Sequence, residues 1–126
     1  MNGFEDNILR NNAIIGNMFA YCKSLKTTDF VIPNGVSSLN YLFYSCIKLT
    51  TPIEKIIPET GFALTNIMMN LAFSETHSIT GDTSKIADLL WNSGKTWKQC
   101  NSAFRYSNIA KTAKEVPDTW ADYRLK

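Results

Sequence analysis

The apolar and polar positions of this 126-residue chain follow one pattern that recurs four times, each copy centred on a phenylalanine. The four are Phe19, Phe43, Phe73 and Phe104, spaced 24, 30 and 31 residues apart. Apolar or cysteine residues stand four positions and one position before each phenylalanine. A small residue follows three positions later, and an aliphatic residue five or six positions later. A period of this length is typical of repeat proteins, whose units bury their apolar faces against one another.

The pattern predicts the elements of one unit. Apolar residues at offsets of one and four positions share one face of a helix, so we expect a short amphipathic helix around each phenylalanine. A tight turn and a very short extended segment should follow, and a proline-marked loop should lead to the next helix. The aliphatic residues expected to point inward from the extended segments are Leu25, Leu49, Ile79 and Ile109. The expected helix N-caps are Ser37–Ser38, Thr65–Asn66 and Thr96.

These elements predict an α/β fold, a short irregular solenoid with short helices and very short strands, in one repeat domain spanning 1–126. The competing interpretation is a small α+β globule in which the similarity of the four segments is a coincidence. Neither end of the chain carries a strong polar cap. We therefore expect the ends to pack against another chain, a larger assembly or flanking sequence.

Two of the segments carry a family resemblance. Met18-Phe19-Ala20-Tyr21-Cys22-Lys23-Ser24-Leu25 and Leu42-Phe43-Tyr44-Ser45-Cys46-Ile47-Lys48-Leu49 resemble the BspA-like leucine-rich repeat, over about residues 12–120. The third segment lacks the cysteine, and the fourth has serine in its place and is one residue shorter. The resemblance implies a right-handed α/β solenoid that works by binding, as in surface proteins of bacteria, adhesins and phage-encoded structural proteins.

Asparagine forms a second column in the repeat. Asn40, Asn70 and Asn101 stand three positions before their phenylalanines, where the first copy has Gly16. An asparagine side chain can satisfy backbone groups at each turn of a stack because it both donates and accepts hydrogen bonds. Plain polarity of an exposed helix face is the alternative.

Candidate chemistry is sparse. The cysteines Cys22, Cys46 and Cys100 lack the paired spacing of a metal site, so we expect free, buried thiols, no metal and no cofactor. A Cys22–Cys46 disulfide is the less favoured alternative. His77 is the only histidine and falls in an expected surface turn; a hydrolase would need it beside a serine or cysteine. We therefore expect no enzymatic activity.

Tyrosines follow the phenylalanines closely, at Tyr21, Tyr44 and Tyr106. Exposed tyrosine suits a binding surface. Half-buried tyrosine is also ordinary, and we favour that second interpretation.

The extended segments predict a binding face, because side chains that flank an inward residue point outward. The predicted partner-binding residues are Ser24, Lys26, Lys48, Thr50, Ser78, Thr80 and Asn108, with Ala110 beside them. This small, polar, mildly basic set suits another protein or a glycan.

Composition narrows the remaining possibilities. Thirteen Lys and Arg against eleven Asp and Glu give a net charge of +2, too weak a bias for nucleic acid. Apolar runs are too short for a membrane span, and the first residues lack a signal-peptide core. A virion, a cell-surface complex and the cytoplasm all remain open. We expect a non-enzymatic protein-interaction or structural module, in an oligomer or as part of a larger assembly. The alternatives are a small intracellular inhibitor of a larger enzyme and, less favoured, a hydrolase.

Overall fold

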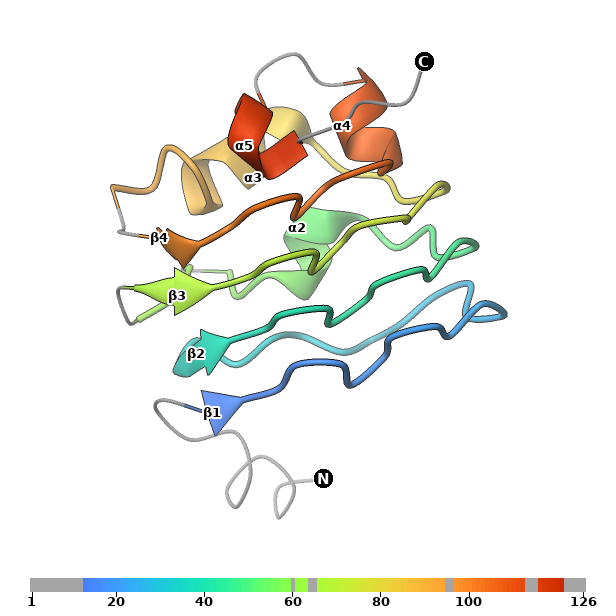
Figure 1. The fold of residues 1–126 in the computed structure, drawn as a ribbon, viewed down its shortest axis with the longest axis horizontal. Helices are drawn as coiled ribbons and strands as arrows, with labels where there is room; N and C mark the ends of the chain where they lie inside the picture. Colours follow the sequence, from blue (N-terminus) through green and yellow to red (C-terminus); the bar gives the residue numbers. More distant parts are fainter. Residues whose placement is uncertain (1–12, 60, 64–65, 95–96, 113–115, 122–126) are drawn as a thin grey trace.

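Successive turns of the chain lie side by side. The computed structural model describes residues 13–59, 61–63, 66–94, 97–112 and 116–121. Four very short strands start the turns and form one parallel sheet in the order β1-β2-β3-β4 (Figure 1). They are β1 (Ala13–Ile14), β2 (Val36–Ser38), β3 (Ile67–Met68) and β4 (Trp97–Gln99). Each turn therefore neighbours the turns before and after it in sequence.

A ladder of backbone hydrogen bonds joins the turns beyond the strands. In the first turn Asn17, Phe19 and Tyr21 donate their N–H groups to carbonyls of the second turn, over 3.0, 2.9 and 2.7 Å. The next two turns repeat this arrangement at the same offsets from their own phenylalanines. The acceptors of the first-turn bonds are Asn40, Leu42 and Tyr44. Every second residue thus bonds to the adjacent turn, as in a parallel sheet.

The phenylalanine rings form one stacked column inside this ladder. Adjacent ring centroids lie 4.9, 5.8 and 5.5 Å apart, with interplanar angles of 3°, 18° and 6°. Phe43, Phe73 and Phe104 are fully buried, while Phe19 packs half-buried against the same core. The four phenylalanines of the repeat therefore share one column, in which three of the rings are fully buried.

The expected helices around the phenylalanines are wrong. These stretches are runs of turns, in which Met18 donates to Ile15 and Cys22 to Phe19 across three residues. Each phenylalanine-centred stretch contains two residues with positive φ angles, Asn17 and Tyr21 in the first, and a right-handed helix excludes such angles. Consecutive three-residue turns produce the same apolar spacing as a helix, which explains the error.

The expected strands are also misplaced, because the strands precede the phenylalanines. Ser37 and Ser38 lie in β2 and cap no helix, while Thr65 and Thr96 fall outside the described residues. Leu49, Ile79 and Ile109 point inward as expected and are buried, with Leu25 half-buried. None of these four aliphatic residues lies in a strand, and Ile109 belongs to a helix.

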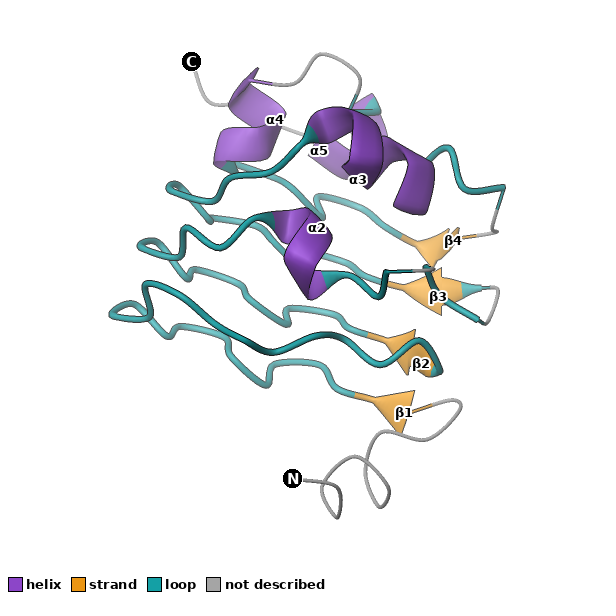
Figure 2. Cartoon of the chain, turned by 180° about the vertical axis from the view of Figure 1, so that it is seen from behind, coloured by secondary structure: helices purple, strands orange, loops and turns teal. Residues whose placement is uncertain are grey.

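Short helices occupy return segments that the sequence predicts as loops. They are α2 (Ile53–Ile56), α3 (Thr83–Leu89), α4 (Asn108–Thr112) and α5 (Asp118–Ala121). Helices α2 and α3 lie on the side of the stack away from the ladder (Figure 2). Asp82 caps α3 by accepting from the N–H groups of Ser84 and Lys85. The return segments therefore form a second layer that covers the phenylalanine core.

The C-terminal end of the column is covered. Trp120 in α5 stacks on Phe104 with centroids 6.4 Å apart and an interplanar angle of 14°. The N–H of Phe104 donates to the carbonyl of Trp120, which extends the ladder by one step. Trp91 and Trp97 meet Trp120 edge to face. At this end a tryptophan therefore takes the place that a further phenylalanine would have in the column, and the expected packing of the ends against another chain stays a prediction. Residues 1–12, at the other end, lie outside the described residues.

Replacing Phe43 with alanine should destabilise the chain by about 3–5 kcal/mol, because it empties the middle of the stacked column. Lys48→Ala is the control and should change the free energy of unfolding by less than about 0.5 kcal/mol, since Lys48 is exposed. Urea denaturation measures both values. Similar losses for the two variants would contradict the central place of the column.

Candidate functional site

The predicted binding residues lie at the edge where each turn reverses direction. Six of them are exposed, and Asn108 is half-buried at the start of α4. The exposed six are Ser24, Lys26, Lys48, Thr50, Ser78 and Thr80. The structure therefore brings the predicted set onto one edge of the stack, although by turns and a helix start rather than by strands.

Some members of this set hold neighbouring turns together. The hydroxyl of Thr50 donates to the carbonyl of Lys26 over 3.0 Å, and that of Thr80 donates to the carbonyl of Thr50 over 2.7 Å. The Asn108 amide nitrogen donates to the carbonyl of Ile79 over 3.0 Å. These hydrogen bonds continue the backbone ladder at the edge of the stack. The fold by itself accounts for these three side chains.

The other members lack such a structural role. Within the described part of the chain, the side chains of Ser24, Lys26, Lys48 and Ser78 make no hydrogen bond or ion pair. Lys23, which is not among the predicted binding residues, is exposed in the same way. The two N-terminal turns therefore display three lysine ammonium groups to solvent.

The asparagine column supports the backbone as the sequence argument proposed. The side-chain oxygen of Asn40 accepts from the N–H of Asn70 over 2.7 Å, and that of Asn70 accepts from the N–H of Asn101 over 2.9 Å. At Gly16 a Cβ atom would lie 2.9 Å from the Asn40 carbonyl oxygen, so the first turn has no room for the same side chain without a shift. The backbone interpretation is confirmed over surface polarity.

Three tyrosines form a surface cluster on the first two turns. The rings of Tyr21 and Tyr41 each meet the ring of Tyr44 edge to face, at centroid distances of 5.2 and 5.4 Å. Tyr21 is 63% exposed and Tyr41 is 38% exposed. Half-burial, the favoured sequence interpretation, is therefore wrong for Tyr21 and holds for Tyr44 and Tyr106. Tyr41 precedes Phe43, so the pattern of tyrosines that follow a phenylalanine does not include it.

We name Tyr21, Tyr41 and Tyr44 the tyrosine cluster. Burial, followed by the neighbouring Tyr21 and Glu75, raises the pKa of Tyr44 above the ordinary value of 10.0. Tyr44 therefore stays a neutral hydroxyl at neutral pH, with a proton to donate. Arg105 lies over the ring of Tyr106, 5.0 Å from its centroid, two turns further along the stack.

His77 pairs with an acid rather than with a nucleophile. Its Nε2 atom lies 3.2 Å from Oε1 of Glu75, and both side chains are substantially exposed. Among the described residues His77 has no serine or cysteine partner. The serine or cysteine pairing that the hydrolase alternative requires is therefore not formed here.

The cysteines are free thiols that pack against the core. Cys46 is fully buried, and its Sγ atom lies 3.0 Å from the carbonyl oxygen of Phe19, to which it donates. Burial raises the pKa of Cys46 to about 11, and burial also raises the pKa of Cys100. Neutral thiols in such surroundings are poor nucleophiles. The expectation of buried thiols therefore holds for Cys46, whereas Cys22 and Cys100 are half-buried; all three are free, so the alternative Cys22–Cys46 disulfide is wrong.

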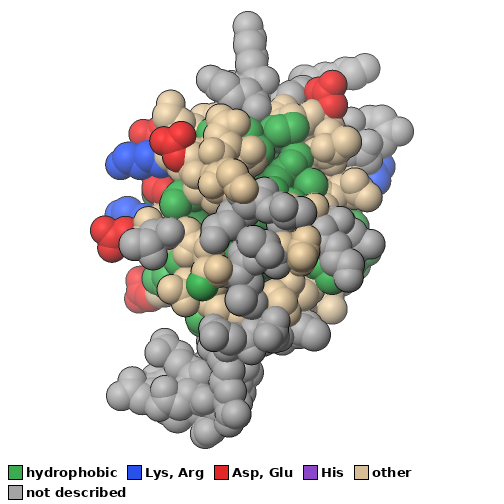
Figure 3. Space-filling view, turned by 90° about the vertical axis from the view of Figure 1, so that its left-hand side faces the viewer, with side chains coloured by type: hydrophobic (Ala, Val, Ile, Leu, Met, Phe, Trp, Pro, Cys, Tyr) green, Lys and Arg blue, Asp and Glu red, His purple; other side chains and the backbone are tan. Residues whose placement is uncertain are grey.

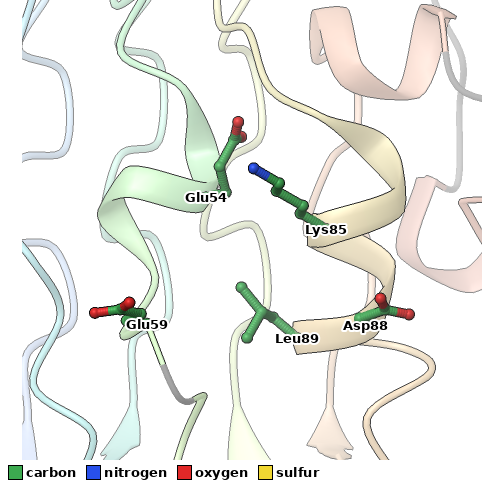
Figure 4. Close-up of a pocket in the computed structure, with 5 residues that line it drawn as sticks. All are labelled: Glu54, Glu59, Lys85, Asp88 and Leu89. Atoms are coloured by element: carbon green, nitrogen blue, oxygen red, sulfur yellow. The ribbon is translucent and has the colours of Figure 1, made fainter.

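A charged hollow lies between α2 and α3 (Figure 4). The side chains of Lys85 and Leu89 reach from α3 toward α2, where Glu54 lines the other side of the hollow. Glu59 and Asp88 add two further carboxylates. In the described residues no group of three or more His, Cys, Asp or Glu side chains could hold a metal ion. Acidic and basic side chains gather at the surface on the side of the molecule that carries α2 and α3 (Figure 3).

No protein-family model, no curated protein and no solved structure matches this chain. In the part of the chain that the structure describes, no helix is long and apolar enough to cross a membrane. The residues themselves therefore supply the argument for function.

Asn40→Ala should lower the free energy of unfolding by about 1–2 kcal/mol, because the N–H of Asn70 loses a part-buried acceptor. Asn40→Asp keeps an oxygen at the same place and should lose less. Urea denaturation of both variants measures the difference. Equal stability of wild type and Asn40→Ala would remove the asparagine column from the account of the fold.

Cys46 should react with iodoacetamide at pH 8 about a hundredfold more slowly in the native chain than in urea. The thiolate is the reacting form, and burial raises the Cys46 pKa from 9.0 to about 11. Peptide mass spectrometry gives the rate at this cysteine in each state. A native rate equal to the denatured rate would show that Cys46 is not buried.

Proposed function

We propose that this chain is a non-enzymatic interaction or structural module, built as a short leucine-rich-repeat-like solenoid of the BspA type. The stacked phenylalanine column, the in-order parallel strands and the asparagine column support the repeat architecture. A stack held by bonds between turns keeps its surface side chains at fixed spacings. Such a surface is suited to recognising a partner with little rearrangement.

The tyrosine cluster is the observation that carries this proposal. Tyr21 and Tyr41 occupy left-handed backbone positions, with φ angles of 63° and 62°. Glycine and asparagine adopt this conformation at less cost than tyrosine. The large exposed rings therefore oppose the local backbone preference, and their burial in the core does not account for them. Contact with a partner does account for them, because tyrosine contributes strongly to binding surfaces.

The test uses asparagine replacements, which suit left-handed positions and so should preserve the fold. The double variant Tyr21→Asn/Tyr41→Asn should lose the partners that the wild-type chain retains from extracts of its native source. The matched control is Tyr106→Asn, the same change at a left-handed position in the fourth turn, and it should keep them. Retention of the same partners by wild type and the double variant would contradict the proposal.

Two further measurements separate the alternatives. Native mass spectrometry of the captured complex distinguishes multi-copy assembly, expected of a structural module, from the tight one-to-one complex of an inhibitor. His77→Ala should leave partner affinity nearly unchanged, since the contact that the structure shows for His77 is with Glu75 and not with a cluster tyrosine. A hydrolase would instead lose turnover in this variant.

A further inference from the structure

The tyrosine cluster is held in place before any ligand arrives. Tyr21 donates its backbone N–H to the Tyr44 carbonyl over 2.7 Å, and Tyr41 donates to the Asn70 carbonyl over 2.9 Å. Ring contacts at 5.2 and 5.4 Å further restrict the side chains. A ligand that binds on these rings therefore does not have to immobilise them, which lowers the entropic cost of binding.

The exposed ring area is small. Two tyrosine side chains exposed to 63% and 38% offer about 200 Å² of surface, because each carries about 150–250 Å² in all. A standard protein interface covers about 800 Å² on each partner. Exposed polar residues, Asn17 and Lys23, lie on the same turn as Tyr21. An apolar patch of this size suits a few rings of a chain-like ligand better than the apolar core of a protein interface.

Charges of both signs lie near the cluster, because Glu75 neighbours Tyr44 from the third turn and three lysines lie on the first two turns. Between residues 13 and 50 the chain carries Lys23, Lys26 and Lys48 against Asp29. The three lysines are exposed and make no ion pair with a described residue. The backbone N–H of Lys23 donates to the carbonyl of Tyr21 over 2.8 Å, which places the Lys23 backbone beside that of Tyr21. The three lysines outnumber Glu75, so a ligand that lies across the first two turns is favoured when it carries negative charge.

We propose that the tyrosine cluster and its neighbouring lysines bind an anionic polysaccharide. This inference rests on the proposed function as an interaction module and names its ligand class. A pyranose ring presents C–H groups on one face and hydroxyls at its edge, which matches the apolar ring and polar hydroxyl of tyrosine. The carboxylates or sulfates of such a chain meet the ammonium groups of Lys23 and Lys48.

Calorimetric titration with polygalacturonate, an acidic polysaccharide, tests the inference. Tyr21→Asn/Tyr41→Asn should weaken binding by about tenfold or more, because two aromatic contacts are lost. The matched control Tyr106→Asn should bind within about twofold of wild type. Lys23→Gln/Lys48→Gln should weaken binding and flatten its dependence on salt. Neutral dextran should bind more weakly than polygalacturonate.

Two further polymers distinguish polysaccharide binding from plain charge attraction and from nucleic-acid binding. Poly-glutamate carries carboxylates without sugar rings and should bind more weakly than polygalacturonate. Equal binding of both polymers, unaffected by the tyrosine variant, would reduce the surface to plain charge attraction and overturn the inference. Binding of single-stranded oligothymidylate at least as tight as that of polygalacturonate, with the same tyrosine dependence, would replace the polysaccharide by a nucleic acid and also overturn it.

The outcome separates this inference from the proposed function. If no polysaccharide binds but the tyrosine variant loses a captured protein, the interaction module stands and the polysaccharide inference fails. If polygalacturonate binds equally to wild type and the double tyrosine variant, the cluster is not its site and the inference fails. Circular dichroism of each variant confirms that the fold is intact before binding is compared.

Discussion

The hydrogen-bond ladder between turns is the constraint on which the rest of the structure depends. Each phenylalanine-centred stretch must point every second N–H group toward the adjacent stretch of the stack. The backbone between those groups nevertheless bends in three-residue turns. Residues with positive φ, two in each turn, reconcile these demands: Asn17 and Tyr21, Tyr41 and Ser45, Leu71 and Glu75, Ser102 and Tyr106. Such conformations cost about 1–2 kcal/mol for residues other than glycine. The ladder and the phenylalanine stack offset that cost.

The same constraint shapes the surface. A left-handed backbone position would ordinarily favour glycine or asparagine, and Asn17 conforms to that preference. Tyr21 and Tyr41 depart from it, and their rings face solvent beside Tyr44. The threonine and asparagine side chains at the turn edge show the opposite case, because their hydrogen bonds to neighbouring carbonyls explain their presence. The part of the surface that stabilises the stack is thereby separated from the part available to a partner.

The sequence predicted the repeat and its core but misjudged the local conformation. Offsets of one, three and four residues arise equally from a helix and from successive three-residue turns, so Phe19 and Phe43 appeared helical. The return segments contain helices of only four to seven residues, such as α2 and α3. Helices this short depend on tertiary packing rather than on intrinsic propensity. Their apolar residues, Ile53 and Ile86 among them, are therefore intelligible only against the stack that buries them.

What the sequence determined by itself was which residues repeat and which of them are buried, because recurrent apolar positions must find one another to leave water. Phe43, Phe73 and the asparagine column follow from that spacing alone. Only the tertiary structure decided that each turn uses left-handed residues, that Trp120 ends the phenylalanine column, and that Tyr41 joins Tyr21 at the surface. These features depend on hydrogen bonds and ring contacts between turns about 15 to 30 residues apart, whose geometry no local pattern encodes.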